Sequence, residues 1–443
     1  MQKSKLPTIG IIGGGILGLT LAYRLSKNGF NVSIIEKSPI LGGLASGLKI
    51  ENQPIEKYYH HFFKSDIDLQ NLLTELNIGD AIQWIPSKMG LFDGKSLLTF
   101  SSALDILTFP KLNIFNRLRL GLVSFYLQKT KNIKQFEKWT AFDWCNKYYG
   151  KTVTDVMWRP LLESKFEGEY KNIAMTWFWT RIHDRSSSRD FPTKDEKLGY
   201  IDGSFNKLIQ SLEEKIIEQG GEIYKNSSIT NYTRIKDIHK IEFKSDDTRQ
   251  SFTKKFDIVV STIPPKHFIQ IFNPPKKYAE KLKKIKFIGA YCFILTLKNS
   301  LSKFYWTSVN DTKSPFVALV EHTNFVEKSK FNNKTIVYLG KYTDNNSELF
   351  KSTKEELLQK CVDYLKKINP AFDEQEIESV EFFKSPEAQH IATTDFEILS
   401  YKSGVKGLLF AHFAQIFPHD RGTNYAIAQA NELFKIISSN KWN

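Results

Sequence analysis

The chain has 443 residues, of which 41% are hydrophobic and 25% are charged, so it can bury a sizeable core and is neither largely disordered nor collagen-like. This length exceeds one ordinary core and predicts two lobes. The formal net charge of +14 leaves two interpretations open: a solvated basic surface, or a patch that faces anions such as nucleotide phosphates.

Several classes of site are not expected from the residue pattern. Cys145, Cys292 and Cys361 show no CxxC or His-rich spacing, so neither a disulfide framework nor a metal site is predicted. No Ser-His-Asp arrangement, HExxH or Walker lysine is present, which disfavours hydrolases and kinases. No leader is recognised before the first predicted strand, and no apolar run approaches the ~20 residues that cross a bilayer. The expected location is the cytoplasm.

A nucleotide-binding motif opens the chain. Residues 8–12 predict a buried strand, which runs into a GxGxxG motif at Gly13, Gly15 and Gly18 and then into a helix that ends near Gly29. The first glycine permits the tight turn, the second lets the backbone approach a pyrophosphate, and the third allows close packing of helix on strand. The helix N-terminus then offers N–H groups and a positive dipole end to phosphates.

The next segment indicates which nucleotide is bound. Residues 30–35 predict a second strand that ends at Glu36, an acid placed to bind a ribose hydroxyl pair, which disfavours NADP. The continuation to Gly42 and Gly43 resembles the second cofactor motif of the amine oxidase and protoporphyrinogen oxidase superfamily of flavoproteins. The resemblance implies FAD, with the paired glycines passing close to its diphosphate. Many members place Arg after the glycines, where this chain has Leu44.

The resemblance extends over nearly the whole chain and implies an α/β fold. Residues 199–224 are similar to the helix and strand that pass the adenosine half of FAD, and residues 256–265 resemble the strand that returns to the nucleotide lobe. We therefore expect a Rossmann-like FAD-binding lobe with an interleaved α+β substrate lobe. The expected FAD-binding lobe comprises residues 1–62, 200–264 and 403–443, and the expected substrate lobe comprises residues 63–199 and 265–402.

The C-terminal segment is similar to the part of the superfamily that meets the flavin ring. Residues 407–411 predict the final strand and residues 425–437 the final helix, with Asn424 expected as its N-cap. Asn424 and Tyr425 are predicted to bind the cofactor, and Arg421 is predicted at the reacting centre. The run D-R-G-T-N-Y resembles a subgroup near UDP-galactopyranose mutase. Most relatives carry Gly-Asp after the strand, where this chain has Ala-His, so the ribityl contact stays unassigned.

Further candidates come from two aromatic stretches that also resemble the mutase. His60 and His61 are candidate catalytic residues, of which at most one is expected to meet the flavin. Arg159 and Arg181 are candidates for binding a substrate diphosphate, because the guanidinium fork suits phosphates; the alternative is ordinary salt bridging. Tyr338 is a candidate for a sugar or isoprenoid pocket, with packing as the alternative.

Residues 97–128 mix Leu, Phe and Ile with arginines in a helical rhythm. We expect a helical pair packed on its lobe, and the alternative is a segment that lies on a membrane.

The favoured function is an FAD-dependent oxidoreductase, in which the flavin accepts a hydride from a small, lipid or sugar substrate. The alternative is a non-redox flavoenzyme that isomerises a nucleotide sugar, as in UDP-galactopyranose mutase, in surface polysaccharide synthesis. A flavoprotein that only binds is a third class. Substrates are expected to be small molecules, including nucleotide or lipid-linked sugars, and nucleic acid is not expected.

Overall fold

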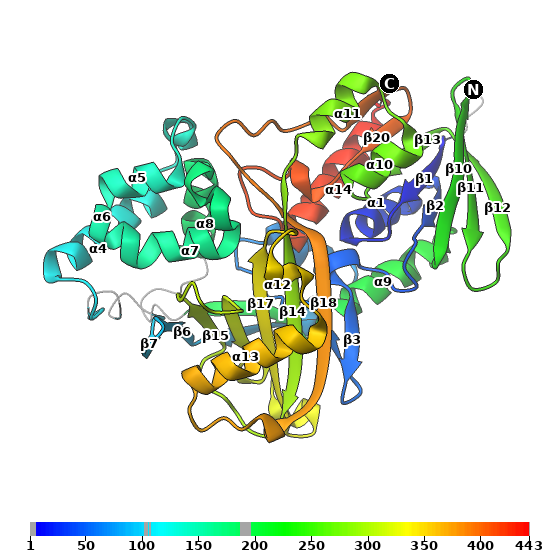
Figure 1. The fold of residues 1–443 in the computed structure, drawn as a ribbon. Coiled ribbons are helices and arrows are strands. Elements are labelled where there is room, and N and C mark those ends of the chain that lie inside the picture. The colour runs from blue at the N-terminus through cyan, green and yellow to red at the C-terminus, as the bar shows by residue number, and fades with distance from the viewer. Residues whose placement is uncertain (1–5, 102–104, 106–107, 187–195, 443) are drawn as a thin grey trace.

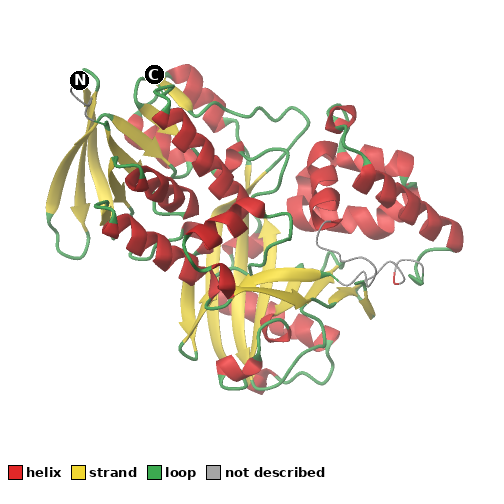
Figure 2. Cartoon of the chain, turned by 180° about the vertical axis from the view of Figure 1, so that it is seen from behind, coloured by secondary structure: helices red, strands yellow, loops and turns green. Residues whose placement is uncertain are grey.

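The computed structural model describes residues 6–101, 105, 108–186 and 196–442 (Figure 1). Two large sheets and a group of helices make up most of the described structure. Figure 2 shows the helical group on the side of the molecule opposite the three-stranded sheet at the nucleotide-binding end. The expected α/β fold with an interleaved second lobe is confirmed.

The sheet that contains the strand before the glycine motif, which we call the nucleotide sheet, has six strands in the order β19-β20-β13-β1-β2-β9. All neighbours pair in parallel except β19 and β20. Because parallel strands end at the same edge, the loops after β1, β2 and β20 share one side of the sheet. The strand bounds are β1 Thr8–Ile12, β2 Asn31–Ile35, β9 Glu222–Tyr224, β13 Ile258–Ser261, β19 Lys402–Val405 and β20 Leu408–Phe410.

Both faces of this sheet are covered, as the continuous apolar strands predict. Alternate residues such as Ile9 and Ile11 share one core with the helices on one face, whereas Ile12 and Val259 belong to a core on the other. The first face carries α1 Ile16–Lys27, α2 Ile67–Glu75, α9 Ser204–Glu218 and α14 Thr423–Ser438. The second face carries α10 Pro265–Phe272, α11 Lys276–Lys283, β10 Ser227–Ile235, β11 Ile238–Ser245 and β12 Ser251–Phe256.

The glycine predicted to end the first helix does so. Gly29 has φ 81°, and its N–H donates to the Ser26 carbonyl oxygen at 2.9 Å. The N–H of Phe30 donates to the Leu25 carbonyl oxygen at 3.1 Å. These two bonds form a Schellman motif, which satisfies the last carbonyls of α1 and turns the chain into β2.

A mixed seven-stranded sheet, in the order β18-β14-β17-β16-β15-β6-β7, forms the second lobe. It is antiparallel except where β15 pairs with β6. Its strands are β6 Met89–Phe92, β7 Leu97–Thr99, β14 Phe287–Leu297, β15 Trp306–Val309, β16 Ala318–Glu321, β17 Thr335–Thr343 and β18 Ile377–His390. Helices α12 Glu348–Lys351 and α13 Lys354–Ile368 accompany it, and two short pairs, β3 Gly47–Ile50 with β4 Gln53–Glu56 and β5 Ile82–Pro86 with β8 Lys197–Ile201, complete the strands.

The helical group has its own core, rich in tryptophan, tyrosine and phenylalanine. Figure 1 shows it opposite β10–β12, with α7 and α8 on its inner side. Its helices are α4 Ile114–Lys129, α5 Ala141–Tyr148, α6 Lys151–Val153, α7 Arg159–Phe166 and α8 Met175–Ser186.

The helical pair expected over residues 97–128 is tested only in part. Leu97–Thr99 form β7, because they pair with β6 at the edge of the second sheet. Residues 102–104 and 106–107 lie outside the described residues, so a first helix there is not tested. One helix of the expected pair is present as α4, which begins at Ile114 and packs Leu120 and Leu127 in the core of the helical group. Among the described residues, no helix is long and apolar enough to cross a membrane.

The lobe boundaries stay a prediction. Leu69, Leu72 and Leu73 of α2, which the prediction assigned to the substrate lobe, pack in the core of the nucleotide sheet. The prediction also assigned Phe268 of α10 to the substrate lobe. Its ring packs against Phe410 of β20 in the nucleotide sheet, with ring centroids 4.7 Å apart.

Candidate active site

The glycine motif forms an open cradle at the start of α1. Gly13 has φ 108°, which L side chains rarely adopt. A Cβ at Gly18 would lie 2.1 Å from the Gly13 carbonyl oxygen, so only glycine permits this packing. A Cβ at Gly15 would meet no atom within 4 Å, and no side chain caps the helix there. This free space beside a helix N-terminus fits the diphosphate of a dinucleotide.

The acid that follows β2 lies directly over this cradle. The Glu36 carboxylate accepts hydrogen bonds from the Gly14 N–H and from the Ser38 N–H, each at 2.6 Å. The carboxylate therefore stands at the carboxyl end of β2, next to the glycine loop. This is the position from which an acid reaches the ribose of a bound nucleotide.

Tertiary packing brings the two glycine motifs together. The Gly42 N–H donates to the Gly14 carbonyl oxygen at 2.8 Å, and Gly42 pairs with Gly15 in an isolated parallel bridge. Gly42 and Gly43 have φ of 104° and 59°, and a Cβ on Gly43 would lie 3.3 Å from the Gly15 Cα. The second motif thus forms a wall of the same cradle. The glycine loop with Glu36 and the paired glycines Gly42 and Gly43 together fit the dinucleotide FAD.

The final helix begins on the same edge of the sheet, and its cap differs from the prediction. Gly422 is the N-cap, and no side chain caps the helix. The expectation that Asn424 is the N-cap is wrong, because the helix begins at Thr423 and Asn424 lies inside it. Asn424 is buried inside the first turn, and its Oδ1 accepts a hydrogen bond from the Leu69 N–H at 3.0 Å. Asn424 therefore ties α14 to α2 and leaves the helix N-terminus uncapped.

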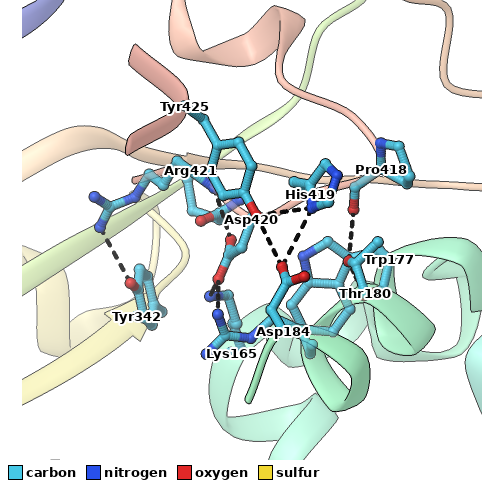
Figure 3. Close-up of polar contacts among 12 residues, drawn as sticks. Lys165, Trp177, Thr180, Asp184, Tyr342, Pro418, His419, Asp420, Arg421 and Tyr425 are labelled. Atoms are coloured by element: carbon cyan, nitrogen blue, oxygen red, sulfur yellow. Dashed lines mark hydrogen bonds and ion pairs between the residues drawn. The ribbon is translucent and has the colours of Figure 1, made fainter. Parts of the chain in front are cut away.

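Three polar side chains meet between α8 and the start of α14 (Figure 3). The Tyr425 hydroxyl lies 2.8 Å from both the Asp184 Oδ2 and the His419 Nδ1, and Asp184 Oδ2 lies 3.2 Å from that nitrogen. Burial raises the pKa of Asp184, but the hydrogen bonds from His419 and Tyr425 outweigh it and hold that pKa below its usual value. The ionised carboxylate orients the imidazole, as in an acid–base dyad.

A second group of charges surrounds Asp420. Its Oδ2 lies 2.5 Å from the Lys165 Nζ and 3.5 Å from an Arg181 Nη1. Burial raises the pKa of Asp420, yet the charges of Lys165 and Arg181 bring it well below its usual value. Arg421 extends the group, because its Nη2 donates to the Tyr342 hydroxyl at 3.1 Å (Figure 3). Three cations, Lys165, Arg181 and Arg421, therefore gather around the Asp420 carboxylate.

The two adjacent histidines point to different neighbours. His60 packs on Phe205, and its Nδ1 lies 2.6 Å from the Tyr58 carbonyl oxygen. His61 packs against Trp306, and its Nδ1 lies 3.0 Å from the Tyr305 hydroxyl. Burial lowers the pKa of His60 to about 4 and that of His61 to about 3, so both are neutral at physiological pH. Their catalytic role stays a prediction.

Two predicted substrate residues have contacts within the protein, and their role in binding a substrate stays a prediction. Arg159 forms an ion pair with Asp155 one turn earlier on the helical segment, and its guanidinium lies 5.5 Å from the centroid of the Phe142 ring. Tyr338 is fully buried, and its hydroxyl donates to the Glu56 carbonyl oxygen at 2.8 Å. Both placements match the packing and salt-bridge alternatives. Of the two predicted arginines in the helical group, Arg181 is the one that contacts Asp420. We call the charges around Asp420 the charged cluster.

Sequence reasoning missed the residues that complete these groups. Asp184 and Lys165 lie on α8 and α7, whereas His419 and Asp420 lie in the loop before α14. His419 and Asp420 adjoin the predicted Arg421, which was the available signal. Nothing in the sequence spacing pairs the helical residues with them, because the partners lie 235 and 255 positions apart.

A buried carboxyl group supports the histidine segment. Glu56 accepts hydrogen bonds from the Tyr200 hydroxyl at 2.9 Å and from the Phe205 N–H at 2.8 Å. Burial raises its pKa to about 7 from 4.5. The folded state therefore holds a proton that the unfolded state releases between these pH values, so stability falls as pH rises through this window.

We expect Glu56→Gln to remove this dependence. Between about pH 5 and about pH 8, the free energy of unfolding of the parent should fall by up to about 3 kcal/mol relative to the variant. Denaturant unfolding at each pH measures the difference, and Glu381→Gln, an exposed change on β18, is the matched control. Parallel pH profiles for parent and Glu56→Gln would contradict the assignment.

Comparison with known proteins gives a family match over most of the chain. Residues 17–412 match the family described as flavin containing amine oxidoreductase. Mitochondrial protoporphyrinogen oxidase of Nicotiana tabacum is 24% identical over 301 residues, which cover 59% of each protein. Carotenoid phi-ring synthase of Chlorobaculum tepidum is 30% identical over 121 residues, which are 26% of this chain and 19% of that protein. The matches thus span less than two thirds of these curated relatives.

Solved structures share the whole fold. A structure named for protoporphyrinogen oxidase from Exiguobacterium sp. 255-15 has a TM-score of 0.77 at 17% identity, covering 98% of this chain and 99% of the other. Reduced UDP-galactopyranose mutase has a TM-score of 0.72 at 14% identity, covering 98% and 96%. An engineered putrescine oxidase has a TM-score of 0.71 at 11% identity, covering 98% and 99%. At these identities the likeness shows the fold alone.

Proposed function

The chain belongs to the flavin containing amine oxidoreductase family, with FAD as its cofactor, and from this premise we propose that it oxidises a small molecule beside the loop between β20 and α14. The observation that carries the proposal is the dyad of Asp184 and His419 at the start of α14. Bound FAD supplies a two-electron acceptor for a hydride. The chain must supply the base, the orientation and the electrostatics.

His419 is suited to take the proton that accompanies hydride loss. With Nδ1 held by Tyr425 and Asp184, proton exchange falls to Nε2. The substrate bears an O–H or N–H beside the C–H bond that breaks. The hydride, together with its bonding electron pair, would be accepted by bound FAD, whereas His419 Nε2 would take the proton and Asp184 would stabilise the imidazolium. The His419 side chain is 40% exposed, which permits access to a substrate.

The uncapped N-terminus of α14 adds electrostatic support. Gly422 and Thr423 bring its backbone N–H groups to the same sheet edge as the glycine cradle. A helix N-terminus stabilises negative charge in its first turn. Negative charge that develops on the reduced ring system would therefore be favoured there, in line with an oxidation.

We expect His419→Gln to slow substrate oxidation about hundredfold and to leave FAD binding intact. The substrate panel covers the classes named by the similar proteins: a diamine, a porphyrinogen, a carotenoid and nucleotide sugars. Anaerobic bleaching of the flavin band measures the rate, and its pH profile tests the base. His267→Gln, at an exposed position on α10, is the control. Equal rates and pH profiles for parent and His419→Gln would refute the assigned base.

The charged cluster favours one second candidate, isomerisation of a nucleotide sugar without net redox change. Lys165, Arg181 and Arg421 bring three cations together beside Asp420, and such a group of cations suits a substrate diphosphate. The similar fold of UDP-galactopyranose mutase supports this candidate.

A direct test separates the two candidates. Reduced holoenzyme is incubated anaerobically with UDP-galactofuranose, and the sugar product and flavin spectrum are recorded together. Pyranose formed with the flavin still reduced would support isomerisation. Substrate-dependent bleaching of the oxidised enzyme, with reoxidation by oxygen, a quinone or a nicotinamide, would support the oxidoreductase.

A further inference from the structure

Helix α4 presents a large apolar face that nothing among the described residues covers. Six large side chains on it are between 46% and 78% exposed. They are Ile114, Phe115, Leu118, Leu122, Phe125 and Tyr126. At 100° per residue they fall within a stripe about 120° wide. A single exposed leucine needs no explanation, whereas six on one helix face mark an interaction surface.

The opposite face of the same helix is already used for folding. Leu120 and Leu127 are buried, and they pack in the core of the helical group. The Trp179 indole N–H donates to the Leu127 carbonyl oxygen at 3.0 Å, which fixes α4 against α8. The apolar stripe therefore faces outward from a firmly held helix. Figure 1 shows α4 in the helical group, on the side of the molecule away from β10–β12.

The charged side chains of the segment that carries the stripe are all positive. Residues 106–136 contain no aspartate or glutamate and six lysines and arginines. Lys129, Lys131 and Lys134 are exposed at the C-terminal end of the helix. The Lys129 Nζ lies 5.7 Å from the centroid of the Phe125 ring, so cation and apolar face are adjacent. Long lysine side chains can lie along an apolar surface and keep their charge in the headgroup layer.

We propose that α4 is a docking surface for an anionic lipid bilayer, with the helix lying in the plane of the interface. Its length of 16 residues is too short to span a bilayer but suits a helix whose apolar stripe enters the headgroup boundary. Anionic headgroups complement the flanking lysines. This assigns to residues 114–129 the membrane-surface alternative that the sequence pattern left open.

The test is co-sedimentation of the FAD-loaded protein with vesicles. Vesicles of phosphatidylglycerol and phosphatidylcholine should bind the parent protein more tightly than phosphatidylcholine alone, and added salt should weaken the binding. A variant that carries Phe115→Ser, Leu122→Ser and Phe125→Ser should lose about tenfold or more in partitioning. Because these side chains are exposed, the variant should retain its FAD and its melting temperature.

Matched controls distinguish binding through this surface from nonspecific hydrophobic or electrostatic binding to vesicles. Serine at three exposed isoleucines elsewhere should leave vesicle binding unchanged: Ile217, Ile235 and Ile398. Glutamine at Lys129, Lys131 and Lys134 should weaken binding to anionic vesicles only, whereas glutamine at three exposed lysines of α11 should not: Lys276, Lys277 and Lys283.

Two results would overturn the proposal. One is equal vesicle binding by the parent and the triple serine variant, including no binding by either. The other is a parent protein that is dimeric by light scattering, becomes monomeric with the triple serine change and binds no vesicles, because the face would then be covered by a second copy.

Discussion

Replacing Gly15 with valine should weaken FAD binding strongly while the protein still folds. The backbone at Gly15 is extended, with φ −71°, and an added Cβ meets no atom within 4 Å. The added Cβ therefore clashes with nothing in the protein and points the side chain into the space in which a diphosphate would lie. We expect affinity to fall on the order of hundredfold or more, which corresponds to about 3 kcal/mol.

Equilibrium titration of the apo-protein with FAD measures this loss, and thermal unfolding of the apo-protein checks the fold. The melting temperature should stay within a few degrees, because valine is only a weaker N-cap than glycine. Gly121→Val, at a glycine on α4 that is also open, is the matched control and should bind FAD normally. Tight FAD binding by Gly15→Val would show that the cradle is not the diphosphate site.

A neighbouring glycine should respond in the opposite way. A Cβ at Gly18 would lie 2.1 Å from the Gly13 carbonyl oxygen, a backbone atom that cannot move aside. Gly18→Ala should therefore destabilise the apo-protein itself. The contrast between the two positions separates loss of the ligand site from loss of the fold.

The second large effect is expected at Asp420. Changing it to asparagine removes the counter-charge that Lys165 and Arg181 share. Asp420 is 7% exposed and the Lys165 side chain 16%, so the orphaned ammonium stays poorly hydrated. Breaking one side of a buried ion pair is far costlier than losing a surface pair. We expect the free energy of unfolding to fall by about 3 kcal/mol.

The pH dependence of this loss has a definite sign. The folded-state pKa of Asp420 is depressed below its ordinary value of 3.8. Its contribution is therefore present above about pH 4 and is lost as pH falls through the folded-state pKa. Denaturant unfolding of parent and Asp420→Asn should converge only in strong acid.

A surface carboxylate with a similar pair of cations provides the control. Asp237 contacts Lys406 and Arg234, each at 3.0 Å, but its side chain is 60% exposed. Asp237→Asn should leave stability nearly unchanged, because solvent screens the pair. A double variant with Lys165→Met should recover part of the Asp420→Asn loss. No difference between Asp420→Asn and Asp237→Asn would contradict the role given to the buried cluster.

Local sequence patterns were enough to locate the nucleotide half of the molecule. The glycine loop, α1, the Gly29 cap, β2 and Glu36 are consecutive, so backbone constraints at fixed spacing specify them without distant partners. The same local logic located β20 and α14. It misplaced the cap of α14, because the bond from the Leu69 N–H to the Asn424 side chain joins positions 355 apart.

Long-range packing, which no local pattern contains, brings together the side chains of the proposed reacting centre. The partners of His419 and Asp420 come from α8 and α7, brought over by the packing of the helical group. The chemistry of the side chains alone did not show which arginine lies in the charged cluster. Arg159 forms an ion pair with Asp155 on its own helical segment, whereas Arg181 contacts Asp420. Hydrophobic periodicity likewise marks both faces of α4 as apolar. Which face the core buries depends on neighbours that no local pattern contains.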